Sequence, residues 1–340
     1  MDESMKTSVL ADDQPRHPAG TNEGGQFAPV GGLGARTANA FRSMPEVDSA
    51  TSREAAGWRK QHQELYNSDP EFKAACDAVG LYTQGSYDPL RDAAHLHATG
   101  EGREGRPFRP DDFQKPLGRA SNPMATYTNY FDGQNVGDSK ACTVGESGGV
   151  LHGLVATAQP TDKPLFRGMR AGYGFDSQTM TTKMSVEIPK AGDEFDLAAT
   201  SSFSASRETA ESFALYHSGR KSARNAPDHT AVAVVYEIAP GAKAANVSAL
   251  SPWKGQREFI TAGKFEVESV EEREHEVYSG DRHTRVKGYH IRVRQKAVLD
   301  KPVNVTPQAG RITRVPRLAP EPKWIGQTFD EQHSDDLEHV

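Results

Sequence analysis

The sequence predicts an α+β protein in which a helical N-terminal half precedes a strand-rich C-terminal half. Between about Asp48 and Gly100, apolar residues recur at helical spacing and are bounded by helix start and stop signals. Beyond about Lys163, short β-branched or aromatic runs are separated by glycine, proline and aspartate turns. Because the strands mostly follow the helices, an alternating parallel α/β fold is disfavoured.

The composition of the 340 residues indicates a globular core diluted by polar segments, with 36% hydrophobic residues and a mean hydropathy of −0.68. The net charge of −6 provides no overall basic field for nucleic acid or membranes. No apolar run approaches the ~18–20 residues of a membrane span, and the N-terminus has no apolar signal core. We therefore expect a cytoplasmic protein without membrane contact, or an effector, toxin or virion-associated protein delivered by a non-classical route.

Cysteine and histidine usage indicates neither a disulfide framework nor a metal centre. Cys76 and Cys142 are far apart and lack metal-ligand or redox spacing, so we expect two inert thiols. The twelve histidines include no His-Glu-x-x-His motif, and His95 and His97 fall on different faces of a predicted helix. We expect no metal cofactor.

Residues 1–45 are predicted to be a disordered tail, because they are rich in glycine, proline, asparagine and alanine without periodicity. Their glycines do not form a phosphate-binding loop, since no strand precedes them and no Gly-Lys-Ser/Thr follows. The segments His17–Gly20 and Gly24–Ala28 resemble short segments of phage virion proteins.

Helix signals are clear in the next part of the chain. Thr51 and Glu54 form a capping-box pattern before the first helix. Two further helices, over 69–80 and 88–100, each begin with Asp-Pro and end at glycine. A charged, proline-containing linker at 101–118 precedes another predicted helix, which begins at Asn122-Pro123.

The strand-rich half contains six short runs with strand character and one helix, 207–218, between the second and the third. The predicted strands are 164–169, 194–204, 230–238, 257–263, 264–272 and 289–295.

Three motifs in this half carry residues suited to nucleotide chemistry. They are Phe166-Arg167-Gly168, Ser202-Phe203-Ser204 and Gln256-Arg257-Glu258. Each motif alone has an ordinary interpretation: an ion-pairing arginine, polar strand serines, or the solvent face of a half-buried strand.

Together and in this order, the motifs resemble those of the Arg–Ser–Glu class of mono-ADP-ribosyltransferases, which includes bacterial exoenzymes and toxins. The resemblance covers roughly residues 120–296. It departs at Phe203, where the family usually has threonine. Alignment on the following helix makes Ser202 the motif's first serine, whereas alignment on the phenylalanine selects Ser204 and Ser206. The choice among these serines stays open here.

The resemblance implies NAD as substrate and a core of two packed, mostly antiparallel sheets with flanking helices. Cleavage of the nicotinamide–ribose bond leaves a cationic sugar, which the carboxylate of Glu258 would stabilise. Arg167 would bind the diphosphate, because its planar guanidinium matches phosphate oxygens. Ser202 would orient Glu258, backbone at Gly168 would hold the nicotinamide amide, and Ser204 would join them in binding NAD.

The Gln-x-Glu form of the last motif bears on the acceptor of ADP-ribose. Gln256 lacks the charge that favours an arginine acceptor, but its amide can pair with an amide, a hydroxyl or a purine edge. Trp253, three residues earlier, could stack on a base, anchor a protein or pack on its own loop. We expect a protein side chain other than arginine. Guanine in nucleic acid, or water in an NAD glycohydrolase, are the alternatives.

We expect a monomer with four parts: a tail at 1–45, a helical region and linker at 46–118, an ADP-ribosyltransferase domain at 119–296, and a proline-containing acidic tail at 297–340. The locally basic segment 283–296 could contact nucleic acid or simply be an exposed closing strand. A non-enzymatic phage or effector structural protein with a degenerate transferase fold is the rival from another functional class.

Overall fold

The computed structural model describes 33–84, 87–99, 130–131, 143–176, 181–184, 188–224, 231–279 and 282–297. The predicted linker at 101–118 and the helix expected from Asn122 lie outside the described residues, as do most of the two predicted tails. None of the described helices is long and apolar enough to cross a membrane.

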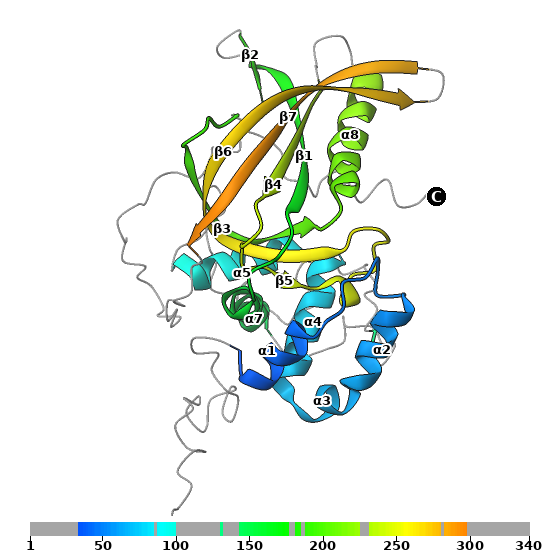
Figure 1. Cartoon of the computed structure of the whole chain (residues 1–340), viewed down its shortest axis with the longest axis vertical. Coiled ribbons are helices and arrows are strands. Elements are labelled where there is room, and N and C mark those ends of the chain that lie inside the picture. Colours follow the sequence, from blue (N-terminus) through cyan, green and yellow to red (C-terminus); the bar gives the residue numbers. More distant parts are fainter. Residues whose placement is uncertain are drawn as a thin grey trace, which may run out of the picture.

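Most of the described helices lie at one end of the molecule, whereas α8 lies against the sheet (Figure 1). They are α1 (Ala35–Arg42), α2 (Arg53–Gln61), α3 (Gln63–Ser68), α4 (Pro70–Thr83), α5 (Tyr87–Thr99), α7 (Val144–Thr157) and α8 (Arg207–Arg224).

Local capping chemistry explains where several helices begin. The Asp69 side chain accepts hydrogen bonds from the backbone N–H groups of Glu71 and Phe72, so α4 begins as predicted. The cap of α2 is Ser52, which accepts from the N–H of Ala55, and the predicted cap at Thr51 is wrong by one residue. Helix α4 also continues three residues beyond its predicted end at Gly80, because Leu81 and Tyr82 are buried in the helical core.

Helix α7 was not predicted, although Thr143 and Glu146 form a capping box at its start. Its glycines have low helix propensity and interrupt the apolar spacing that would predict a helix. A Cβ added at Gly148 would lie 2.4 Å from the Cβ of Ala93, so the glycine allows α7 to pack closely on α5.

The described strands form one hydrogen-bonded sheet system of mostly antiparallel strands. They are β1 (Leu165–Asp176), β2 (Thr181–Met184), β3 (Glu194–Ser204), β4 (Ala231–Ile238), β5 (Ala245–Asn246), β6 (Glu258–Ser279) and β7 (Arg282–Ala297). Strand β1 pairs with both β3 and β4, which closes the circuit β1-β3-β6-β7-β4; only β4 and β7 are parallel. The α+β class with a mostly antiparallel core is confirmed, and the strands expected in two packed sheets are joined in one hydrogen-bonded circuit.

The strands predicted at 257–263 and 264–272 are one strand, β6. Gly263 was expected to form a turn between two strands, but with a φ of 128° it lies inside the single strand β6. The pairing of β6 with β7 shifts register immediately after this glycine, between Lys264 and Phe265.

Three apolar clusters hold the layers together. One fills the inside of the strand circuit, with Phe203, Phe259 and Phe265 among its members. A second packs α8 against β1 and β4. The third joins the helices to Ile260 and Ala262 of β6. The helical layer therefore shares a core with the strand that begins at Glu258.

Helix α1 lies inside the segment 1–45 that we predicted to be a tail. Phe41 is buried against Trp58 and Phe72, with ring centroids 6.2 and 5.9 Å away, so tertiary packing orders a segment without a strong local helix signal. The division into domains stays a prediction.

Candidate active site

Adjacent strands bring the three predicted motifs together. Strand β3 is paired on one side through Phe166↔Ser204 and on the other through Ser204↔Glu258. Arg167 follows Phe166 in β1 and therefore lies near the end of β3, where its Nη1 donates to the backbone carbonyl of Ser202 at 2.9 Å. Residues far apart in the sequence meet because three strands are hydrogen-bonded side by side.

Glu258 is a buried carboxyl group at the start of β6, with only 5% of the residue exposed. Burial raises its pKa, while the nearby hydroxyls of Ser202 and Ser251 and the charge of Arg167 act in the opposite direction. Its Oε2 is buried, and although the hydroxyls of Ser202 and Ser251 lie close enough to affect the carboxyl group, none of the described residues forms a hydrogen bond of normal geometry to this oxygen. A buried oxygen without a partner is costly and requires an explanation, and in combination with a raised pKa and a neighbouring arginine a ligand-binding role is one that fits.

The three candidate serines have different surroundings. Ser202 lies near Glu258, and its Oγ donates to the hydroxyl of Tyr82 at 3.2 Å. Ser204 donates to the carbonyl of Gln256 and accepts from the N–H of Ser206. Ser206 in turn accepts from the N–H of Thr209 in the first turn of α8. Ser204 and Ser206 thus hold the loop before Glu258 and the start of α8, whereas Ser202 does neither and lies near Glu258.

Two side chains from the helices, neither of which was predicted, also contact the end of β3. Tyr82 of α4 donates to the carbonyl of Thr200 at 3.2 Å, and burial raises its pKa to about 12. Arg91 of α5 donates to the same carbonyl at 3.0 Å and to the hydroxyl of Ser201 at 3.2 Å. No local signal marks either residue, because both act through packing of the helices on β3.

The loop before Glu258 is held mainly through its backbone carbonyls. The carbonyl of Gly255 accepts from the hydroxyl of Thr209 at 2.7 Å, and that of Arg257 accepts from the N–H of Ala205 at 3.1 Å. Trp253 is 45% exposed, and its indole N–H donates to the carbonyl of Thr83 at 2.7 Å. The tryptophan is therefore anchored at one edge and open at the other, and Gln256, three residues later, is half-buried.

Gly168 has a packing explanation. A Cβ added there would lie 1.7 Å from the backbone oxygen of Ala210, so the glycine lets α8 approach β1. This contact accounts for the glycine of the first motif without a ligand.

A cavity of about 280 Å³ lies elsewhere, between α1, the end of α7 and β5, and is lined partly by Met44, Lys163 and Phe259. None of the predicted site residues lines it. Among the described residues, no group of three histidine, cysteine, aspartate or glutamate side chains is arranged to hold a metal ion. Cys76 is buried as a free thiol, and Cys142 lies outside the described residues.

No protein-family model matches the sequence, and no curated protein resembles it significantly. Similar solved structures include the Vis toxin, an ADP-ribosyltransferase from Vibrio splendidus, with 12% identity, a TM-score of 0.32, and coverage of 78% of this chain and 91% of that one. Another is Plx2a, an ADP-ribosyltransferase toxin from Paenibacillus larvae, with 14% identity, a TM-score of 0.33, and coverage of 71% and 94%. A third is an ADP-ribosyltransferase from Clostridium botulinum, with 12% identity, a TM-score of 0.31, and coverage of 73% and 99%. Likeness at this level assigns neither a catalytic residue nor a substrate to this chain.

Proposed function

We propose that this protein is a mono-ADP-ribosyltransferase that cleaves NAD at the nicotinamide–ribose bond and transfers ADP-ribose to a macromolecular acceptor. One observation carries the proposal: the unpartnered, buried Oε2 of Glu258 lies where Ser202 and Arg167 converge from two other strands. The sequence motifs that resemble those of the Arg–Ser–Glu transferases contribute these same three residues.

The chemistry follows from charge. As the bond to nicotinamide breaks, its electron pair leaves with nicotinamide and positive charge develops on the ribose. The carboxylate of Glu258 would accept a hydrogen bond from a ribose hydroxyl and stabilise that charge more strongly than it stabilises bound NAD. The acceptor then forms the new bond to the ribose carbon and releases a proton.

Three other groups would position NAD for this step. The guanidinium of Arg167 would bind the diphosphate, because its planar donors match two phosphate oxygens. Ser202 would orient the carboxylate by donating its one hydroxyl hydrogen to Glu258 in place of Tyr82, since its hydroxyl lies near both groups. Backbone at Gly168 and the hydroxyl of Ser204 are the remaining NAD contacts that we propose. The transferase domain at 119–296 would also use Tyr82 and Arg91 of the helical region.

We further propose that the acceptor is a protein side chain other than arginine. Gln256 presents an amide, which does not neutralise a guanidinium but can pair with another amide or a hydroxyl. The exposed part of Trp253 would contact the acceptor, because an aromatic surface held at one edge loses little conformational freedom on binding. The chain's net charge of −6 gives nucleic acid little attraction.

Labelled NAD tests the whole proposal. The wild-type protein is incubated with NAD labelled in the adenylate part and with cell lysate, and the products are treated with protease or nuclease. We expect protease-sensitive label, whereas nuclease-sensitive label would indicate a nucleic acid acceptor and free labelled ADP-ribose alone would indicate a glycohydrolase.

The matched variants are Glu258→Gln and Glu266→Gln. Both replace a carboxylate on β6 by an isosteric amide, but Glu266 pairs on the surface with Arg294 and Lys296 at 3.1 and 2.8 Å. We expect Glu258→Gln to reduce nicotinamide release by about 10²–10³-fold while NAD still binds, and Glu266→Gln to behave as wild type. Undiminished release by Glu258→Gln would reject the assignment.

A further inference from the structure

The segment Met44–Ala50 connects α1 to α2 and lies against residues 246–251, which precede the Gln256–Glu258 motif in the sequence. We call this segment the strap. Its backbone is tied at both ends: the carbonyl of Met44 accepts from the side-chain amide of Asn246 at 2.9 Å, and the N–H of Ala50 donates to the carbonyl of Ser251 at 2.7 Å. In the middle, the N–H of Val47 donates to the hydroxyl of Ser248 at 3.1 Å. The strap is therefore an ordered part of the molecule.

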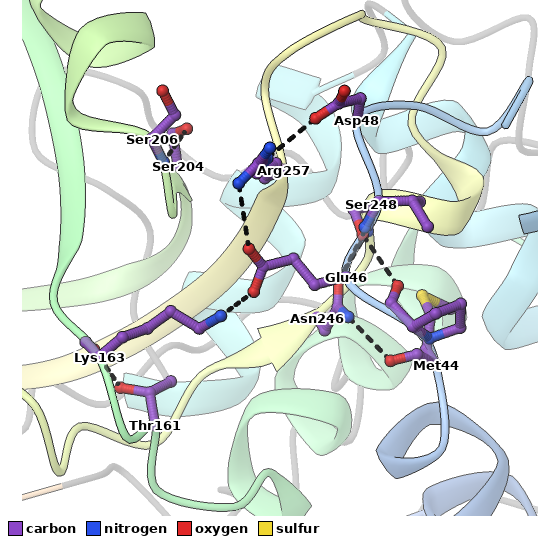
Figure 2. Close-up of polar contacts among 12 residues, drawn as sticks. Met44, Glu46, Asp48, Thr161, Lys163, Ser204, Ser206, Asn246, Ser248 and Arg257 are labelled. Carbon is purple, nitrogen blue, oxygen red and sulfur yellow. Dashed lines mark hydrogen bonds and ion pairs between the residues drawn. The ribbon is translucent and has the colours of Figure 1, made fainter. Parts of the chain in front are cut away.

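The strap directs two carboxylates at Arg257 (Figure 2). Asp48 Oδ1 lies 2.8 Å from Arg257 Nε, and Glu46 Oε1 lies 3.9 Å from Arg257 Nη1. Glu46 also forms an ion pair with Lys163, which precedes β1. Both carboxylates raise the pKa of Arg257, with Asp48 the larger cause.

The residue held by the strap has an unusual backbone. Arg257 has a φ of 42°, and among the described residues it is the sole non-glycine with a positive φ. This left-handed conformation is unfavourable for a residue with a side chain, so surrounding contacts must maintain it. Arg257 separates Gln256 from Glu258, and its backbone angles therefore set the direction of one relative to the other.

We propose that the strap, through Asp48 and Glu46, is a positioning element that keeps Gln256 aimed at the acceptor while NAD is bound at Glu258. The inference rests on the proposed function. The side chains of Arg257 and Asp48 are 48% and 63% exposed, and exposed ion pairs contribute little to global stability. The expected effect is therefore on the geometry of the loop 251–257, which already receives backbone contacts from β3 and α8.

The test compares the double variant Glu46→Gln/Asp48→Asn with wild type and with the matched control Glu266→Gln/Glu268→Gln. The control also removes two exposed carboxylates that are paired with arginines, but these lie further along β6. The first measurement is hydrogen–deuterium exchange of residues 251–257 without NAD. The second is the ratio of transferred to hydrolysed ADP-ribose, together with kcat and KM for NAD cleavage.

We expect exchange in the loop to rise about three- to tenfold in the strap variant, the size that loss of the ion pairs of Asp48 and Glu46 allows. The transferred fraction should fall by a similar factor, while kcat and KM for NAD cleavage stay within about twofold of wild type. The control should change neither quantity.

Unchanged exchange in the strap variant would overturn the proposal, and so would faster exchange with an unchanged transferred fraction. A parallel loss of NAD cleavage would show that the strap supports the catalytic centre as a whole, which also contradicts it. A wild-type protein that does not cleave NAD would refute the proposed function separately, and the exchange measurement would then still decide whether the strap orders the loop.

Discussion

Replacement of Gly168 by alanine tests how α8 is seated on the strand that carries Arg167. The added Cβ would lie 1.7 Å from the backbone oxygen of Ala210, 2.7 Å from its carbonyl carbon and 3.0 Å from the backbone nitrogen of Ala214. Since non-bonded heavy atoms pack at roughly 3.5 Å, α8 would have to move by about 1.8 Å. Every clashing atom is backbone, so no side-chain rotation relieves the overlap.

The magnitude follows from the packing of α8. Overpacked sites typically cost about 1–3 kcal/mol, and a clash between two backbone segments belongs at the upper end of that range, near 3 kcal/mol. A helix displaced from β1 would also open the contacts of Ala210 and Ala214 with Phe166. For the roughly 200 residues that the structure describes, we expect the melting temperature to fall by about 6–12 °C.

The assay is chemical and thermal unfolding of Gly168→Ala followed by circular dichroism. Gly57→Ala is the matched control, because no atom lies within 4 Å of a Cβ at Gly57 in helix α2. That substitution should stabilise the protein by about 0.5–1 kcal/mol. A Gly168→Ala variant within about 0.5 kcal/mol of wild type would refute the packing argument, and loss of NAD binding at unchanged stability would show that Gly168 serves the ligand instead.

Three further predictions concern the site. Because burial raises the pKa of Glu258 in the folded state, its ionised form opposes folding: the stability that it contributes is present at low pH and is lost as pH rises through the folded pKa. Glu258→Gln should therefore stabilise the protein near pH 7 and lose that advantage near pH 4, and urea unfolding that showed a loss of stability at pH 7 would contradict this sign. Tyr82→Phe removes the hydroxyl that accepts from Ser202 and donates to the carbonyl of Thr200, so it should cost about 1 kcal/mol and lower kcat for NAD cleavage more than it changes KM; equal kinetics would place Tyr82 outside the site. Arg257→Gly should be more stable than Arg257→Ala by about 1 kcal/mol, because only glycine accepts the left-handed φ without strain, and equal unfolding midpoints would argue against that conformation.

Several features of the fold were predictable because they depend on local chemistry. The Asp-Pro start of α4 and the strand ranges 194–204 and 231–238 were predicted closely, since capping oxygens and β-branched runs act over a few residues. Helix α7 was not predicted, because its glycines are favourable only when α5 lies against them. The single strand β6 was predicted as two strands for a similar reason: its pairing with β3 lies on both sides of Gly263, and its pairing with β7 begins at Lys264.

The candidate site divides in the same way. Arg167, Glu258 and the group of serines at 202, 204 and 206 could be selected from the sequence alone, because each stands in a short motif whose residue types suit NAD chemistry. Their meeting, the burial of Glu258 and the choice among the three serines depend on which strands are neighbours, and the sequence does not state strand order. Tyr82, Arg91 and the strap carry no motif at all. Tyr82 and Arg91 reach the site because α4 and α5 pack on β3, and the strap reaches it because it packs along residues 246–257. The free energy of that packing belongs to the assembled chain rather than to any one segment.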